Sequence, residues 1–134
     1  MIEIIVRAIL VNEENKILLV RRVKEPEKEK WSLPGGKVKW RETAKKGIQR
    51  EIKEELQLIF TPHYLFFTEY ILPEKKLHSH VMYYDGKYSG TILAKDDEIS
   101  ELHFFSYSEV ETLKNIAWNH REMILKYFNK IEMA

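Results

Sequence analysis

The chain has 134 residues, no cysteine and a formal net charge of +1. This length fits one domain over residues 1–134, and the near-zero net charge gives no reason to expect a nucleic-acid or membrane partner. The lack of cysteine excludes disulfides, thiolate metal sites and a cysteine nucleophile. The N-terminus lacks a signal-peptide pattern, and no apolar run approaches the ~20 residues of a membrane helix. We therefore expect a cytoplasmic protein, as a monomer or homodimer.

In chain order, residues 2–11 are β-branched and apolar and predict a buried strand. After the turn "NEEN", residues 16–23 are expected to return as its hairpin partner. Residues 31–40 predict two short strands around a glycine turn. Residues 43–57 predict a helix with Thr43 as its N-cap.

The second half of the chain predicts further strands and two helices. Residues 59–72 predict a long strand in which Pro62 marks an edge or a bend, and residues 80–90 predict another strand. An acidic loop and a last strand follow, and Ser108 with Glu111 has the spacing of a capping box. An amphipathic helix ends the chain. We expect an α+β fold in which a mixed sheet lies between helices, an α/β/α sandwich.

The helix predicted over 43–57 carries three glutamates on one side. At ~100° per residue, Glu54 and Glu55 fall about 60° and 40° to either side of Glu51, next to an apolar stripe. Neighbouring carboxylates raise each other's pKa unless a cation intervenes. A hard divalent cation such as Mg²⁺ would relieve the repulsion, because it prefers carboxylate oxygens. The alternative is an ordinary charged surface whose glutamates pair with Lys53 or Arg50.

The segment before this helix has a fixed spacing to it. Gly36 is followed by Glu42 after five residues and by Arg50-Glu51 after seven more, and the series continues Ile52-x-Glu54-Glu55-x-Gln57-Leu58. This resembles the Nudix box, G-x5-E-x7-R-E-U-x-E-E-x-G-U, where U is a bulky aliphatic residue. All but one of the defined positions match. The flanking "WSLPGG" and the order of strands also resemble the Nudix fold.

The single departure from the Nudix box is Gln57, where the pattern has glycine. A left-handed glutamine would cost roughly 1 kcal/mol, so we expect the helix to run one residue longer instead.

The resemblance implies a Mg²⁺-dependent hydrolase, with Mn²⁺ as a possible substitute, that cleaves the diphosphate linkage of a nucleoside diphosphate derivative. A nucleotide would be its small-molecule partner. The implied metal ligands are Glu51, Glu54, Glu55 and the backbone carbonyl of Gly36. The implied nucleophile is water attacking phosphorus, and the general base is Glu54, Glu55 or a glutamate of the acidic loop, Glu98 before Glu101.

The remaining candidates bind phosphate or support the box. Arg22 and Lys37 are expected to contact substrate. Glu42 and Arg50 are expected to be structural, with Arg50 orienting Glu51 or bonding loop carbonyls. The segment "LLVRRVKE" slightly favours nucleoside triphosphates as substrates, although ADP-ribose stays open as an alternative. The rival hypothesis is a Nudix-fold domain that senses a nucleotide without cleaving it, but such sensors often lose box glutamates.

Overall fold

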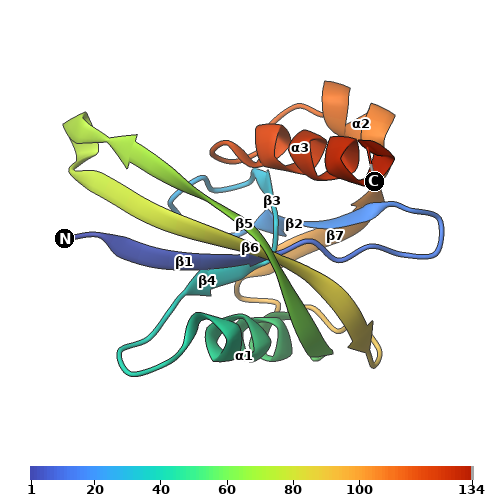
Figure 1. Ribbon diagram of the computed structural model, residues 1–134, viewed down its shortest axis with the longest axis horizontal. Coiled ribbons are helices and arrows are strands. Elements are labelled where there is room, and N and C mark those ends of the chain that lie inside the picture. The colour runs from blue at the N-terminus through green and yellow to red at the C-terminus, as the bar shows by residue number, and fades with distance from the viewer. Residues whose placement is uncertain (134) are drawn as a thin grey trace. The chain divides into compact units, whose positions relative to one another are not determined.

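The computed structural model describes residues 1–133, which form two compact units (Figure 1). The first unit comprises residues 1–10 and 34–93, and the second comprises residues 11–33 and the chain from residue 94 onward. Among the described residues, no helix combines the length and the apolar character needed to cross a membrane.

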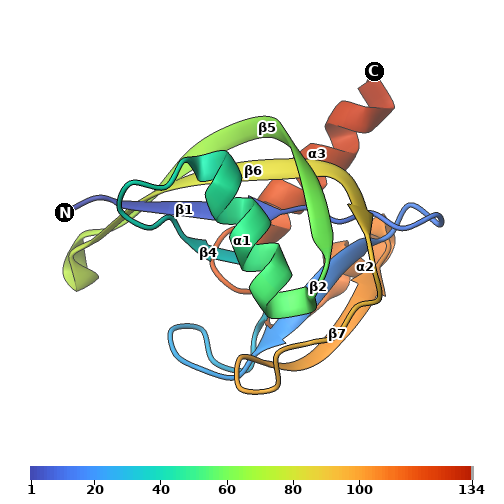
Figure 2. The ribbon, with the colours of Figure 1, turned by 90° about the horizontal axis from the view of Figure 1, so that it is seen from below.

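The first unit is a four-stranded sheet with one long helix. In chain order its elements are β1 (Glu3–Ala8), β4 (Gly35–Lys37), α1 (Ala44–Leu56), β5 (Ile59–Leu72), the short 3-10 helix η1 (Pro73–Lys75) and β6 (Leu77–Ser89). The strand order is β4-β1-β6-β5. β1 is parallel to β6 and the other pairs are antiparallel, so this sheet is mixed, as predicted. α1 crosses one face of the sheet (Figure 2).

The second unit is a three-stranded antiparallel sheet with two helices. Its elements are β2 (Ile17–Arg22), β3 (Trp31–Ser32), β7 (Ile99–Phe105), α2 (Tyr107–Thr112) and α3 (His120–Met133). The strand order is β3-β2-β7. α2 and α3 pack together, with the rings of Tyr107 and Phe128 in edge-to-face contact. The α+β class is therefore confirmed, while the strands divide between two sheets.

The predicted hairpin between the first two strands is wrong. The turn forms as expected, because the Asn12 side chain accepts hydrogen bonds from the backbone N–H groups of Glu14 and Lys16. Only one bridge, between Val11 and Ile17, continues the pairing. Both edges of β1 are already occupied by β4 and β6, so β2 pairs with β3 and β7 instead.

The start of α2 also differs from the prediction. The capping box of α2 is made by Ser106 and Glu109 rather than by Ser108 and Glu111. Both pairs have the same spacing, and the first is used because β7 already ends at Phe105. The long strand β5, by contrast, matches its predicted range, and it is an edge strand as Pro62 suggested.

The C-terminus of α1 differs as well, because the helix does not extend to Gln57. Gln57 adopts the left-handed conformation at φ 60° and ψ 27°, and its N–H bonds the Lys53 carbonyl. Leu56 and Leu58 are both fully buried. A continued helix would turn Leu58 about 200° away from Leu56, so only a sharp end buries both side chains.

Candidate active site

α1 places the three box glutamates in different environments. Thr43 caps the helix by accepting a hydrogen bond from the Lys46 N–H, as predicted, and Ile48, Ile52 and Leu56 bury its apolar stripe. Next to this stripe, Glu55 is only 7% exposed. The Glu51 side chain is largely covered, whereas that of Glu54 is 48% exposed.

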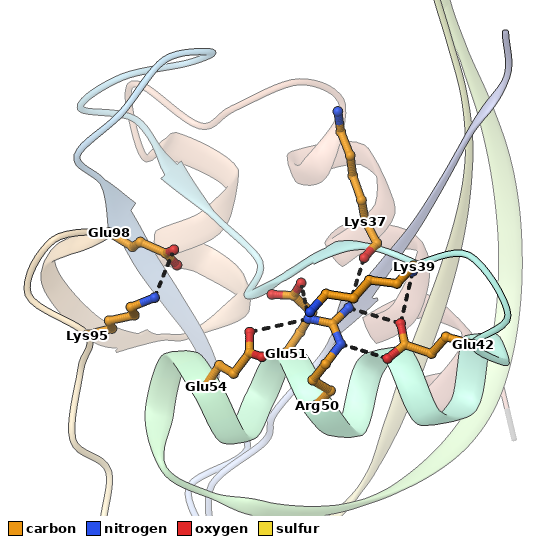
Figure 3. Close-up of polar contacts among 8 residues, drawn as sticks. All are labelled: Lys37, Lys39, Glu42, Arg50, Glu51, Glu54, Lys95 and Glu98. Carbon is orange, nitrogen blue, oxygen red and sulfur yellow. Dashed lines mark hydrogen bonds and ion pairs between the residues drawn. The ribbon is translucent and has the colours of Figure 1, made fainter.

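Arg50 connects the glutamates to the loop before the helix (Figure 3). Its guanidinium donates two hydrogen bonds to the Glu42 carboxylate, at 2.7 and 3.0 Å, and one to the Lys37 carbonyl at 3.0 Å. The remaining contacts run from Nη1 to Glu51 at 2.9 Å and to Glu54 at 3.3 Å. The expected contact of Arg50 with Glu51 is therefore present, while the carbonyl that it bonds belongs to the last residue of β4 and not to the loop.

The pairing with Glu42 shifts both titrations. The Arg50 side chain, helped by the Lys39 backbone N–H at 3.0 Å, holds the pKa of Glu42 at about 2, well below its ordinary value of 4.5. The same hydrogen bonds raise the pKa of Arg50 above its ordinary value. The pair is therefore fully charged at neutral pH, and it fixes the loop that follows β4 against α1.

Sequence reasoning missed how many carboxylates Arg50 would join. The contact to Glu54 follows from i,i+4 spacing on a helix, which is visible in the sequence. The contact to Glu42 spans eight residues and depends on how the loop folds back, which local spacing does not reveal. The pairing of Glu54 with Arg50, part of the ordinary-surface alternative, is present in the structure.

Gly36 provides the closest backbone approach to this cluster. It lies on β4 opposite Val6. A Cβ atom built on Gly36 would lie 2.6 Å from the Glu51 carboxyl carbon. Any side chain here would therefore displace the Glu51 carboxylate, so glycine is required for the carboxylate to lie against the strand.

The residues around Gly36 suit a hard divalent cation by their chemistry. The side chains of Glu51, Glu54 and Glu55 and the backbone carbonyl of Gly36 supply only oxygen ligands, and the lack of a side chain at Gly36 leaves its backbone open to the Glu51 carboxylate. As the described side chains stand, no three His, Asp or Glu residues are arranged to hold a metal ion. Two of the carboxylates are instead turned toward Arg50.

Lys37 lies on β4 near the box but is held away from its glutamates. Its ammonium pairs with Glu3 at 2.7 Å. Figure 3 shows the side chain extending away from Glu51 and Glu54.

The other predicted site residues belong to the second unit. Arg22 donates from Nε to the Pro26 carbonyl at 2.8 Å, and its guanidinium lies 4.8 Å from the centre of the Trp118 ring. Glu98 is partly exposed and lies 3.4 Å from the Lys95 ammonium.

Glu101, the second candidate in the acidic segment, lies on β7. Its carboxylate pairs with Arg21 at 2.8 Å. Of the two candidate bases in this segment, Glu98 therefore has the longer contact to its cation.

Comparisons with known proteins identify the family of this chain. The family model of the NUDIX domain matches residues 1–127. An ADP-ribose pyrophosphatase from Methanocaldococcus jannaschii is 32% identical over 120 residues, which cover 88% of this chain and 69% of that protein. The mouse 8-oxo-dGDP phosphatase is 34% identical over 65 residues, only 20% of its own length.

Solved structures show the same fold. A MutT NUDIX hydrolase from Burkholderia pseudomallei superimposes with a TM-score of 0.83 at 26% identity, covering 94% of this chain and 97% of that one. The MutT protein from Methanosarcina mazei reaches 0.85 at 23% identity, covering 99% and 96%. The chain therefore belongs to the Nudix hydrolase family.

Proposed function

We propose that this chain is a Mg²⁺-dependent pyrophosphohydrolase that cleaves the diphosphate linkage of a nucleoside diphosphate derivative. The observation that carries the proposal is the Glu51 carboxylate lying against Gly36, on the same side of α1 as Glu54 and Glu55. These residues stand at the spacing of the Nudix box.

The proposed metal ligands are Glu51, Glu54, Glu55 and the Gly36 carbonyl. When bound, the cation would neutralise phosphate charge and lower the pKa of the attacking water. Glu54 is the ligand that can move most easily, because it is half exposed and its contact to Arg50 is the longest of the set. Arg50 and Glu42 are proposed to hold Glu51 and the loop in place throughout, since neither has to leave the other.

The general base is proposed to be Glu54 or Glu55, with Glu98 as the candidate from the acidic loop. Arg22 and Lys37 are proposed to contact phosphate. Lys37 would first have to release Glu3, and Arg22 would have to give up its bond to the Pro26 carbonyl.

ADP-ribose is our first candidate substrate, because the archaeal relative named for that activity matches along 88% of the chain. Hydrolysis would yield AMP and ribose 5-phosphate. Oxidised purine nucleotides are the second candidate, because the 8-oxo-dGDP phosphatase matches over 65 residues of this chain. The nucleoside triphosphates favoured by the sequence also contain a diphosphate linkage, so the same assay should include them.

The experiment is a substrate panel measured with Mg²⁺, with Mn²⁺ and with EDTA. We expect AMP release from ADP-ribose that stops in EDTA and falls sharply in Glu54→Gln, with Glu74→Gln as the exposed control. Calorimetry of Mn²⁺ binding in the presence of a non-hydrolysable ADP-ribose analogue gives a readout independent of turnover. Nucleotide binding without any product would instead support the sensor alternative.

A further inference from the structure

The sheet of the first unit has an exposed region on the face that α1 crosses. Gly36 and Val6 define this face, because they are paired and Glu51 of α1 lies against Gly36. By strand alternation, Ile4, His80, Phe67 and Ile71 point to the same side. We call these four residues the distal sheet face. Phe67 and Ile71, on the edge strand β5, are 53% and 52% exposed.

The distal sheet face carries a stacked pair of aromatic rings. The rings of Phe67 and His80, on neighbouring strands, are stacked with centroids 4.7 Å apart and planes 21° apart. Ile4 on β1 is opposite His80 in the register and continues the surface. An exposed aromatic pair on a sheet can receive the planar face of a nucleobase, whatever the base.

A basic loop lies next to this face. It consists of Lys39, Trp40 and Arg41, between β4 and α1, and all three side chains are exposed. The Val38 N–H donates to the Ile4 carbonyl at 2.9 Å, which ties the start of the loop to β1 beside the distal sheet face. Figures 1 and 2 both show this loop projecting from the start of α1, toward the side on which the chain's N-terminus lies.

Trp40 is the most unusual residue of the basic loop. Its side chain is 88% exposed, and the Arg41 guanidinium lies 5.5 Å from its ring centre. This exposure leaves most of a large apolar ring in contact with water. Arginine next to an exposed aromatic ring is a combination that binds both the phosphate and the base of a nucleotide.

The charge around the loop is positive. Lys45 and Lys46, in the first turn of α1, are also exposed. The nearest carboxylate in sequence, Glu42, is already neutralised by Arg50. The near-zero net charge of the whole chain therefore does not exclude a locally basic surface.

We propose that the distal sheet face and the basic loop together bind single-stranded nucleic acid, at a site separate from the box glutamates. Phosphates would contact Lys39, Arg41 and Lys45, while bases stack on Trp40 and on the Phe67–His80 pair. Glu69 lies on the same face, 3.2 Å from the His78 ring nitrogen, so the phosphates are expected on the basic loop and not beside Glu69. The occupant carries both negative charge and planar apolar groups, which matches the two kinds of exposed side chain.

The test uses the whole chain and fluorescein-labelled 20-nucleotide oligo(U) and oligo(dT), followed by fluorescence anisotropy from 50 to 200 mM KCl. We expect saturable binding that weakens with salt, with a logarithmic slope of about −2 for three neutralised phosphates. Trp40→Ala and Phe67→Ala should each weaken binding at least about fivefold, because each removes one stacking platform. Arg41→Gln should weaken binding and make the salt slope less negative.

Matched controls lie at the other end of the same sheet. Ile59→Ala removes an exposed apolar side chain from β5, and Lys87→Gln removes an exposed cation from β6. Both should bind like the parent chain. Circular dichroism checks folding, and hydrolysis by Phe67→Ala should be unchanged because Phe67 takes no part in the proposed chemistry.

Three results would overturn the proposal. One is no binding at 10 µM protein in 50 mM KCl. Another is binding that Arg41→Gln and Lys87→Gln weaken equally while Trp40→Ala and Phe67→Ala do not, which would indicate general electrostatics. The third is sedimentation with phosphatidylserine vesicles, or Phe67-dependent self-association, in the absence of any oligonucleotide binding. Failure of hydrolysis alone would leave the nucleic-acid proposal standing.

Discussion

Replacing Glu42 with glutamine should destabilise the chain by an amount that depends on pH. Glutamine resembles the protonated acid in shape and removes the charge that Arg50 and the Lys39 N–H stabilise. The fall of the Glu42 pKa from 4.5 to about 2 corresponds to about 3 kcal/mol at neutral pH. Solvent reaches one side of the pair, so we expect a loss of about 2 kcal/mol at pH 7.

The sign of the pH dependence follows from the lowered pKa. Between pH 4.5 and about 2 the unfolded chain binds a proton at Glu42 that the folded chain does not, so acid weakens the parent protein through this group. The contribution is complete above pH 4.5 and is lost as the pH falls through the folded value. We therefore expect the difference between parent and Glu42→Gln to shrink to about 1 kcal/mol at pH 3.

Urea unfolding followed by circular dichroism at pH 7, 5, 4 and 3 measures this difference directly. Glu74→Gln is the matched control, because Glu74 is exposed in the same unit and lies outside the Arg50 cluster, and it should differ little from the parent at any pH. An unchanged 2 kcal/mol gap at pH 3, or a gap below about 0.5 kcal/mol at pH 7, would refute the assignment of this stability to the Glu42 charge.

The remaining predictions concern the ends of the Nudix box and its ligands. Gly36→Ala should fold but lose most metal binding and turnover, because its Cβ would displace the Glu51 carboxylate; Mn²⁺ calorimetry equal to that of the parent would contradict this. Gln57→Gly should raise the free energy of unfolding by up to about 1 kcal/mol, because glycine adopts φ 60° without strain; an unchanged or lower urea midpoint would show that the residue is not strained. Glu54→Gln should reduce kcat at saturating Mg²⁺ while keeping the parent's thermal midpoint, and full activity in this variant would remove Glu54 from the proposed ligand set.

The sequence predicted the box helix and the long strands well, because their signals are local. Thr43 could be identified as the cap of α1 from its position before the helical pattern, and the range of β5 followed from its β-branched and aromatic run. Strand pairing was not predictable in the same way. β1 looked like the partner of β2 because a turn joins them, yet pairing depends on which edges are free, and β6 is more than sixty residues away in the sequence.

The ends of the helices could not be predicted from local sequence either. Ser106 and Ser108 each precede a glutamate by three residues, so the sequence offered two equivalent capping boxes, and only the end of β7 chooses between them. Gln57 was expected to stay helical because left-handed glutamine is unfavourable. The burial of both Leu56 and Leu58 outweighs that local cost, since each buried leucine contributes about 1.5–3 kcal/mol.

The three box glutamates carry like charges that repel one another, and Arg50 reduces this repulsion. Repulsion among Glu51, Glu54 and Glu55 would be unfavourable in the absence of metal, and the Arg50 guanidinium relieves it by contacting two of the three. A divalent cation binding the same carboxylates must therefore compete with a cation that is already part of the chain. Because the Arg50 bonds to Glu42 are shorter than its bond to Glu54, the exposed Glu54 contact is the one to yield. Arg50 can then stay in place between Glu42 and Glu51 whether or not metal is bound, so one arginine accounts both for the stability of the metal-free helix and for the fixed position of Glu51.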